Sequence, residues 1–466
     1  METPQAPPRP ASPIDRLNDW LRTSTMLKML AIGFLILLLL IPTGMLQALI
    51  HERETTRDEA INEISAKWGS EQTIGGPVLS VPVESVLTDE KGQRTLQRYY
   101  VHFLPDELRI NGTLRPEQRS RGIYNVMLYN TRLTISGRFA RPTVAQLPVP
   151  PGNVRWEQAF IAVGIRDLKG LNDTIRFRLN GRNQTVNPGI PTADVLTSGV
   201  SIPVRLDADT YRFDCTLNLN GSTQLSFLPF GKETVVSLTS PWATPSFTGS
   251  FLPDQRSVTA DGFRATWRVL QYNRNYPQQG LGAFLPKRPV GRAQAGLENT
   301  ELDVADFGVK LLLPVDEYQK TTRSAKYAVM FIIITFSVFF FVEILARRRI
   351  HPIQYLLVGF AISLFYLLLL SLSEHMPFDR AYLIGTVVIV ALVTFYVRYV
   401  FRSTKLTLLF GGLLTLLYGF FYSLLQLEDY SLLLGTLGLL LILTAVMYLT
   451  RHVNWYRAYE TEPLKE

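Results

Sequence analysis

Cysteine and histidine are scarce in this 466-residue chain. Cys215 is its single cysteine, so an intramolecular disulfide and a Cys-x-x-Cys zinc or redox motif are both excluded. Neither His-x-x-x-His nor His-Glu-x-x-His spacing occurs among the five histidines, which are His51, His102, His351, His375 and His452. We therefore predict neither a metal site nor a cofactor, and we interpret the four histidines that flank apolar segments as residues of the membrane boundary.

Long runs of like charge are absent too, although the formal net charge is +8. The arginines of the polar middle section are scattered, which favours a solvated surface over a footprint for nucleic acid. A Gly-x-Ser-x-Gly elbow is missing, and Gly231-Lys232 lacks the upstream glycine of a phosphate loop because Ser226 stands at that position. These absences leave no motif that indicates an enzyme class.

Six long apolar segments dominate the rest of the sequence, and a membrane span takes about 20 such residues. They cover 26–50, 327–346, 352–372, 381–400, 406–427 and 430–449. The first continues past Pro42 to Ile50. The apolar core of a cleaved signal peptide has roughly 7 to 15 residues, so we favour a retained anchor, with cleavage as the open alternative. We predict an α-helical bundle of six transmembrane helices, with the lipid bilayer as its surroundings.

Basic residues gather at alternate ends of these segments. They are Arg16, Arg22, Lys28, Arg347, Arg348, Arg349, Arg398, Arg402, Lys405 and Arg451. Cytoplasmic loops carry the excess of lysine and arginine, so both termini are predicted to be cytoplasmic. The predicted parts are a cytoplasmic tail at 1–25, a first span at 26–50, an exported domain at 51–326, a five-helix bundle at 327–449 and a cytoplasmic tail at 450–466.

The predicted exported domain has a period of two. Tyr211, Phe213 and Cys215 alternate with polar residues, which is typical of half-buried antiparallel strands. Four tight-turn dipeptides predict hairpins, namely Asn111-Gly112, Asn180-Gly181, Asn220-Gly221 and Asp261-Gly262. We predict a large, mostly-β, sandwich-like antiparallel domain. Whether it is one unit, or two divided near 187–203, stays open.

Three ionisable residues near the predicted membrane boundaries are candidates for function. Glu343 lies inside the second apolar segment, where a carboxylate is a candidate functional residue by default. The alternative is a structural role, in which Glu343 pairs with Arg347 four residues later. Glu374 and His375 are adjacent in a predicted outer loop, where a carboxylate beside an imidazole could sense pH. The alternative is that these neighbours point in different directions. We predict no catalytic residue.

Several motifs resemble those of the CreD inner-membrane protein family, also called cell envelope integrity proteins, over residues 24–456. They are Gly76–Val83, Pro245–Pro253, Arg323–Ala328, His351–Gly359, Tyr366–His375, Leu432–Thr436 and Asn454–Tyr456. The resemblance implies a Gram-negative cell inner membrane, a periplasmic β domain, expression under a two-component envelope-stress response, and links to β-lactam and colicin tolerance. It implies no catalytic residue.

Three classes of function are then open. The leading hypothesis is a non-enzymatic envelope integrity protein that binds an unidentified periplasmic or membrane protein partner, with a homo-oligomer as one arrangement. A transporter or channel is the second, although the apolar segments offer few polar groups for a path. An enzyme acting on envelope lipid or peptidoglycan is the third, and converging carboxylates in a deep pocket of the β domain would favour it.

Overall fold

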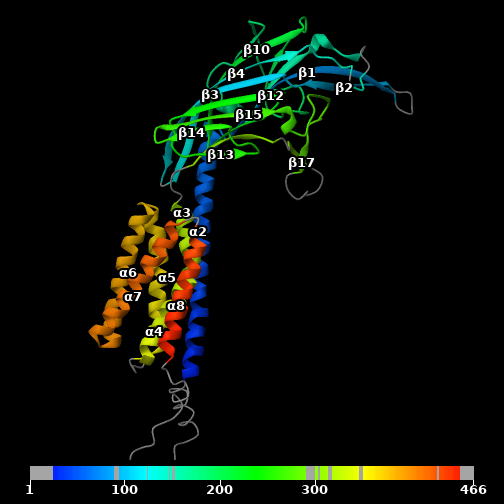
Figure 1. The fold of residues 1–466 in the computed structure, drawn as a ribbon. Helices are drawn as coiled ribbons and strands as arrows, with labels where there is room; N and C mark the ends of the chain where they lie inside the picture. The colour runs from blue at the N-terminus through cyan, green and yellow to red at the C-terminus, as the bar shows by residue number, and fades with distance from the viewer. Residues whose placement is uncertain are drawn as a thin grey trace, which may run out of the picture. The chain divides into compact units, whose positions relative to one another are not determined.

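A computed structural model describes residues 25–451 of the chain, with gaps at 89–93, 123, 146, 150–152, 290–299, 303–304, 313–316, 346–349 and 428–429. Contacts divide the chain into two compact units. We call Met1–Thr56 with Val315–Glu466 the helical unit, and Arg57–Pro314 the β unit. Apart from the long helix α2 (Thr25–Trp68), which has residues in both, the long helices and the large sheets are segregated between the two units (Figure 1).

Each of the six predicted apolar segments overlaps a helix of the helical unit. After α2 come α3 (Glu317–Lys326), α4 (Ala328–Leu345), α5 (Pro352–Ser373), α6 (Phe378–Phe401), α7 (Thr404–Gln426) and α8 (Ser431–Thr450). In the described part of the chain, four helices are long and apolar enough to cross a membrane, or five if the pair α3–α4, bent by 45°, counts as one span. The described side chains of α8 form only the shorter apolar stretch Leu433–Tyr448. The membrane prediction is confirmed at this coarser level.

Aromatic side chains form the centre of the helical unit. The ring of Tyr418 on α7 lies 4.5 Å from that of Phe331 on α4 and 4.8 Å from that of Phe365 on α5. Tyr382 on α6 donates a 2.9 Å hydrogen bond to the carbonyl of Tyr418. Four helices are therefore joined through one buried cluster, in which offset and edge-to-face ring contacts add to the packing.

Two large sheets and one small one make up the strands of the β unit. The nine-stranded sheet contains β1 (Gln72–Thr88), β2 (Arg94–Phe103), β5 (Phe160–Ile165), β8 (Asn187–Pro188), β9 (Gly199–Pro203), β11 (Gln224–Phe227), β13 (Pro245–Gly249), β16 (Gln279–Leu281) and β19 (Phe307–Leu311). The eight-stranded sheet has the order β14 (Gln255–Thr259), β15 (Gly262–Leu270), β12 (Glu233–Ser240), β3 (Glu107–Arg121), β4 (Tyr124–Ala140), β10 (Thr210–Ser222), β6 (Arg176–Leu179) and β7 (Arg182–Gln184). The pair β17 (Lys287–Pro289) and β18 (Thr300–Leu302) forms the small sheet.

Both large sheets contribute to a single hydrophobic cluster. Cys215 and Leu217 of β10 belong to it, as do Leu79 and Val81 of β1. The predicted alternation along β10 is confirmed, because buried and solvent-facing residues alternate from Thr210 to Gly221. β9, in the region that left a division of the domain open, pairs with β5 inside the nine-stranded sheet.

The strands are not all antiparallel as predicted. β1 pairs in parallel with β11, and β12 pairs in parallel with β3, so each large sheet is mixed. The physical reason is that alternation reports which face of a strand is buried, whereas strand direction depends on long connections between distant parts of the chain.

Two of the four predicted hairpin turns are also wrong. Asn180-Gly181 joins β6 to β7 as expected, and the hairpin predicted at Asp261-Gly262 joins β14 to β15, with Gly262 as the first residue of β15. Asn111-Gly112 lies inside β3, where a Cβ on Gly112 would come within 2.7 Å of the side chains of Leu133 and Leu238. Asn220-Gly221 lies inside β10, where a Cβ on Gly221 would lie 2.4 Å from the ring of Tyr129. In both strands glycine makes room for a large neighbour rather than for a turn.

Candidate functional site

Glu343 is a buried carboxylate that joins two helices. Its side chain is 6% exposed and accepts hydrogen bonds from the backbone N–H of Ile350 (3.1 Å) and from the hydroxyl of Tyr355 (2.9 Å). The alternative partner Arg347 lies outside the described residues. At the same end of α5, His351 caps the helix by accepting from the N–H of Ile353 at 3.3 Å. Glu343 and His351 therefore both stabilise the N-terminal end of α5, Glu343 by accepting from Ile350 and Tyr355 and His351 by capping the helix.

Glu374 and His375 have separate partners. The carboxylate of Glu374 lies 3.8 Å from the guanidinium of Arg53 on α2. The imidazole of His375 instead contacts the carbonyl of Ser371, one turn earlier in α5, at 3.1 Å. In the residues described, no hydrogen bond or ion pair joins Glu374 to His375, so the geometry supports the reading in which the two neighbours point in different directions.

A buried Ser-His-Asp line joins two strands of the nine-stranded sheet to the segment between β8 and β9, and no sequence motif indicates it. Ser80 on β1 and His102 on β2 are direct cross-strand neighbours, with Oγ 2.8 Å from Nδ1. The other imidazole nitrogen lies 3.2 Å from a carboxylate oxygen of Asp194. Only the β1–β2 register brings these residues together, so their spacing in the sequence carries no signal.

The line lacks the access that nucleophilic catalysis needs. Ser80 and His102 are each 1% exposed, and the imidazole lies close to the rings of Tyr100 and Phe284, with centroids 6.4 and 6.2 Å away. Serine bonds to Nδ1 and aspartate to Nε2, the reverse of the arrangement in serine proteases. Buried polar groups of this kind satisfy one another's hydrogen bonds. Among the residues described, no group of three His, Cys, Asp or Glu side chains could hold a metal ion.

The solvent-facing side of the eight-stranded sheet offers a more accessible site. Six polar side chains stand in register on neighbouring strands, in the order Ser257, Arg264, Thr239, Thr113, Arg132 and Asn218. We call these six residues the polar row. It crosses from β14 through β15, β12, β3 and β4 to β10. Because residues paired directly across neighbouring strands lie on the same face of a sheet, all six project to the same side.

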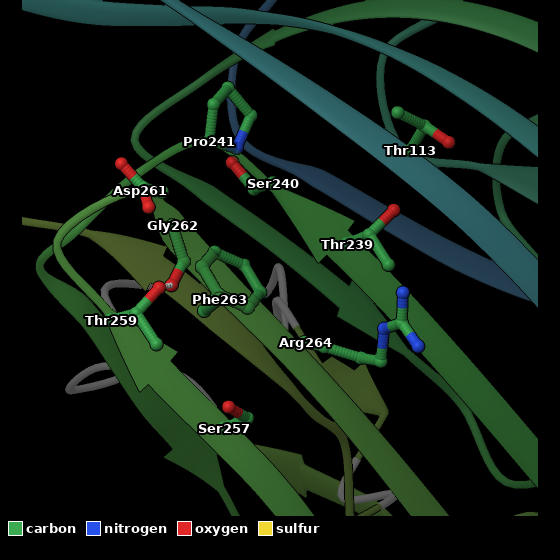
Figure 2. Close-up of a pocket in the computed structure, with 10 residues that line it drawn as sticks. All are labelled: Thr113, Thr239, Ser240, Pro241, Ser257, Thr259, Asp261, Gly262, Phe263 and Arg264. Carbon is green, nitrogen blue, oxygen red and sulfur yellow. Dashed lines mark hydrogen bonds between the residues drawn. The ribbon is translucent and has the colours of Figure 1, made fainter.

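One pocket of about 540 Å³ lies over the first half of the polar row. Figure 2 shows Arg264, Thr239 and Ser257 reaching from three strands, with Asp261 and Gly262 at the turn that joins β14 to β15. The Thr259 hydroxyl donates a 3.2 Å hydrogen bond to the Gly262 carbonyl and holds this turn closed.

A second pocket, of about 600 Å³, lies over the other half, and Thr113 lines both. Its other lining residues are Arg115, Asn130, Arg132, Asn172, Asp173 and Asn218. The pKa of Asp173 is held below its usual range by the backbone N–H of Thr174 and the amide of Asn218, so this carboxylate is charged at neutral pH. Every lining side chain of this pocket is polar.

The comparisons with known proteins agree with the motifs of the sequence. The profile described as "Inner membrane protein CreD" matches residues 24–456. This chain belongs to the CreD family. The "Inner membrane protein CreD" of Escherichia coli (strain K12) is 33% identical over 437 residues, which cover 92% of this chain and 93% of that protein. The predicted membership is confirmed, and with it an inner-membrane protein that has apolar helices and a large β-rich domain.

Among solved structures, the crystal structure of an M1 zinc metallopeptidase mutant from Deinococcus radiodurans, bound to a Tyr-Ser-Ala substrate, aligns with 78% of this chain and 96% of its own. The sequence identity is 11% and the TM-score is 0.17. A TM-score this low carries no conclusion about fold or activity.

Proposed function

We propose that this CreD-family chain is a non-enzymatic envelope integrity protein whose β unit is periplasmic and binds a component of the cell envelope. The observation that supports the proposal best is the polar row together with the two pockets over it, where Arg115, Arg132 and Arg264 make no ion pair or hydrogen bond with any residue that the structure describes. Cationic side chains arranged across a regular sheet face suit the recognition of a ligand outside the chain.

We propose six transmembrane spans, both termini cytoplasmic, and two sheets packed as a sandwich in the periplasm. An assembly of several copies in the bilayer is compatible with this arrangement. The family resemblance adds a role in the response to envelope stress and in tolerance of β-lactams and colicins.

Labelling of single cysteines tests the topology. Burial raises the pKa of the Cys215 thiol to about 12, so this native cysteine stays protonated and unreactive. In intact cells a membrane-impermeant maleimide should label Thr259→Cys and Arg380→Cys, and it should label Lys405→Cys only after permeabilisation. Labelling of Lys405→Cys in intact cells would overturn the six-span orientation.

Charge removal in cells tests the binding function. The triple change of Arg115, Arg132 and Arg264 to glutamine should abolish protection against a β-lactam, whereas Arg109→Gln should retain it. Arg109 is the matched control, because it is exposed on β3, the strand of Arg115, and faces the same side. Protection by the triple variant at the normal protein level would refute the proposal.

A hydrolytic enzyme is the second candidate, and the Ser80–His102–Asp194 line is the observation that favours it. Such an enzyme requires that Ser80 become accessible to substrate. Loss of protection on Ser80→Ala, with unchanged folding, would support this candidate over the first.

A further inference from the structure

We propose that the polar row binds an acidic glycan, meaning a sugar chain that carries carboxylates as well as free hydroxyls. The inference rests on the proposed function, in which the β unit binds an envelope component. It adds the chemical class of the ligand, and three features of the two pockets lead to it.

The first feature is net positive charge, because the two arginines of the second pocket, Arg115 and Arg132, outnumber the charged carboxylate of Asp173. Arg115 on β3 and Arg132 on β4 are diagonal neighbours, since Thr113 is paired with Arg132 and Arg115 with Asn130. Diagonal neighbours across strands lie about 7–8 Å apart, within reach of one bound anion. Guanidinium groups bind carboxylates through two parallel hydrogen bonds. The carboxylate of Asp173 in the same pocket is already held by Asn218 and Thr174.

The second feature is a set of outward hydrogen-bond acceptors. The amides of Asn130 and Asn172 each donate to the side-chain oxygen of Asn220, at 3.0 and 3.1 Å. The amide of Asn218 donates to Asp173 at 3.0 Å. No described residue donates to the amide oxygens of these three asparagines, so each is available to a ligand. An amide oxygen accepts two hydrogen bonds, and sugar hydroxyls are suitable donors.

Together these two features separate an acidic sugar from other anions. A phosphate or the side chain of an acidic peptide would satisfy the arginines but would offer few donors to the amide oxygens. A peptide also uses apolar anchors, and the second pocket has no apolar lining residue. In the first pocket Phe263 is 4% exposed, which leaves Pro241 as its accessible apolar side chain. A carboxylated sugar supplies both the anion and the donors.

The third feature is length. Adjacent strands lie about 4.8 Å apart, so Arg264 on β15 and Arg132 on β4, three strands apart in the sheet order, are separated by about 14 Å. The pockets meet at Thr113, which makes one elongated site rather than two isolated ones. A chain with carboxylates repeated along it can reach both arginines, whereas a single sugar ring reaches one.

The test uses the purified full-length protein in detergent and measures binding by isothermal titration calorimetry. The probe is a soluble oligosaccharide of alternating N-acetylglucosamine and N-acetylmuramic acid, and the control is an N-acetylglucosamine oligosaccharide of the same length, which lacks the carboxylates. We expect the acidic chain to bind at least about tenfold more tightly, as the loss of charge-assisted hydrogen bonds implies. Equal affinity for the two chains would overturn the inference.

Matched variants locate the site. Combined Arg132→Gln and Arg264→Gln should weaken binding of the acidic chain at least about tenfold, whereas Arg109→Gln should leave it within about twofold. All three arginines are exposed, and melting temperatures within the error of wild type establish that the variants are folded. An equal loss in Arg109→Gln would show diffuse charge attraction instead of a site, and would overturn the inference.

A polyglutamate peptide of matched charge is the third probe. Binding as tight as that of the acidic glycan would overturn the glycan assignment and favour an acidic protein segment. If no probe binds, but the triple arginine variant still loses protection in cells, the glycan inference fails and the proposed function stands. If that variant is also fully active in cells, both fail.

Discussion

The hydroxyl of Tyr355 donates a 2.9 Å hydrogen bond to the carboxylate of Glu343 and so joins the start of α5 to the end of α4. The ring of Tyr355 also packs edge-to-face against Phe336 and Phe339, with centroids 5.5 and 5.4 Å away. A carboxylate buried next to a break between helices is costly unless its oxygens are bonded. The hydrogen bonds from Ile350 and Tyr355 give the buried carboxylate of Glu343 a structural role at this break.

Removing either partner should destabilise the helical unit. We expect Glu343→Ala to lower the free energy of unfolding by about 1–3 kcal/mol, because two buried donors lose their acceptor, and Tyr355→Phe to cost about 1 kcal/mol. Reversible denaturation in mild detergent measures both. Ser337→Ala on α4 is the control, since that exposed hydroxyl bonds only to its own helix. A stable Glu343→Gln variant without cellular activity would contradict this structural role.

The fold was predictable where local pattern determines it. Apolar length located all six helical segments, and alternation located the buried face of β10. The alternation of apolar and polar residues does not determine the direction of a strand. It also does not distinguish a glycine that forms a turn from a glycine inside a strand that leaves space for a large side chain on a neighbouring strand. Gly112 and Gly221 belong to the second kind, and only the packed positions of Leu238 and Tyr129 reveal it.

The site was less predictable, because it is made of pairings between distant strands. Ser257 and Asn218 belong to one row only through the registers of six strands. Ser80 and His102 likewise meet only across β1 and β2. By contrast, Glu343, Glu374 and His375 were conspicuous because charge is rare near apolar segments. The structure gives Glu343 and His375 partners nearby in the chain, whereas the partner of Glu374 is Arg53 on α2.

Gly359 on α5 should tolerate no side chain larger than its hydrogen. A Cβ there would meet a methyl carbon of Leu39 on α2 at 2.2 Å and the ring of Phe336 on α4 at 3.0 Å. We expect Gly359→Val to separate these helices and to lower the melting temperature in detergent, since overpacking typically costs about 1–3 kcal/mol. Gly412→Val, where no atom lies within 4 Å of the added Cβ, is the matched control on α7. Equal melting temperatures for the two variants would refute this packing.

Acid should weaken the attachment of the end of α2 to β3. Hydrogen bonds from Arg121 and Lys67 lower the pKa of Glu63 to about 2 from its ordinary 4.5. A depressed pKa means that this contribution to stability is complete above about pH 4.5 and is lost as the pH falls towards 2. We expect the difference in melting temperature between wild type and Glu63→Gln to shrink over that interval, and to be smaller in high salt because the pair is exposed. A difference independent of pH would contradict the role of this carboxylate.

The Ser80–His102 pair separates a structural role from a catalytic one. Ser80→Ala leaves Nδ1 of a buried imidazole without its partner and should cost about 1–3 kcal/mol of stability. Replacing both residues with apolar ones, as in Ser80→Ala with His102→Leu, should cost less than the sum of the two single changes, because neither polar group is then stranded. Asp194→Asn is the milder control, since Asp194 is 29% exposed and water can replace its contact. Denaturation of the full-length variants measures the coupling.

At equal protein levels, the double variant should still protect cells if the pair is structural. An enzyme would lose its activity with either single change, because removing a nucleophile or general base costs at least about 10²-fold in rate. Loss of protection in a double variant of normal stability would therefore assign the Ser-His-Asp line to catalysis and would overturn the non-enzymatic proposal.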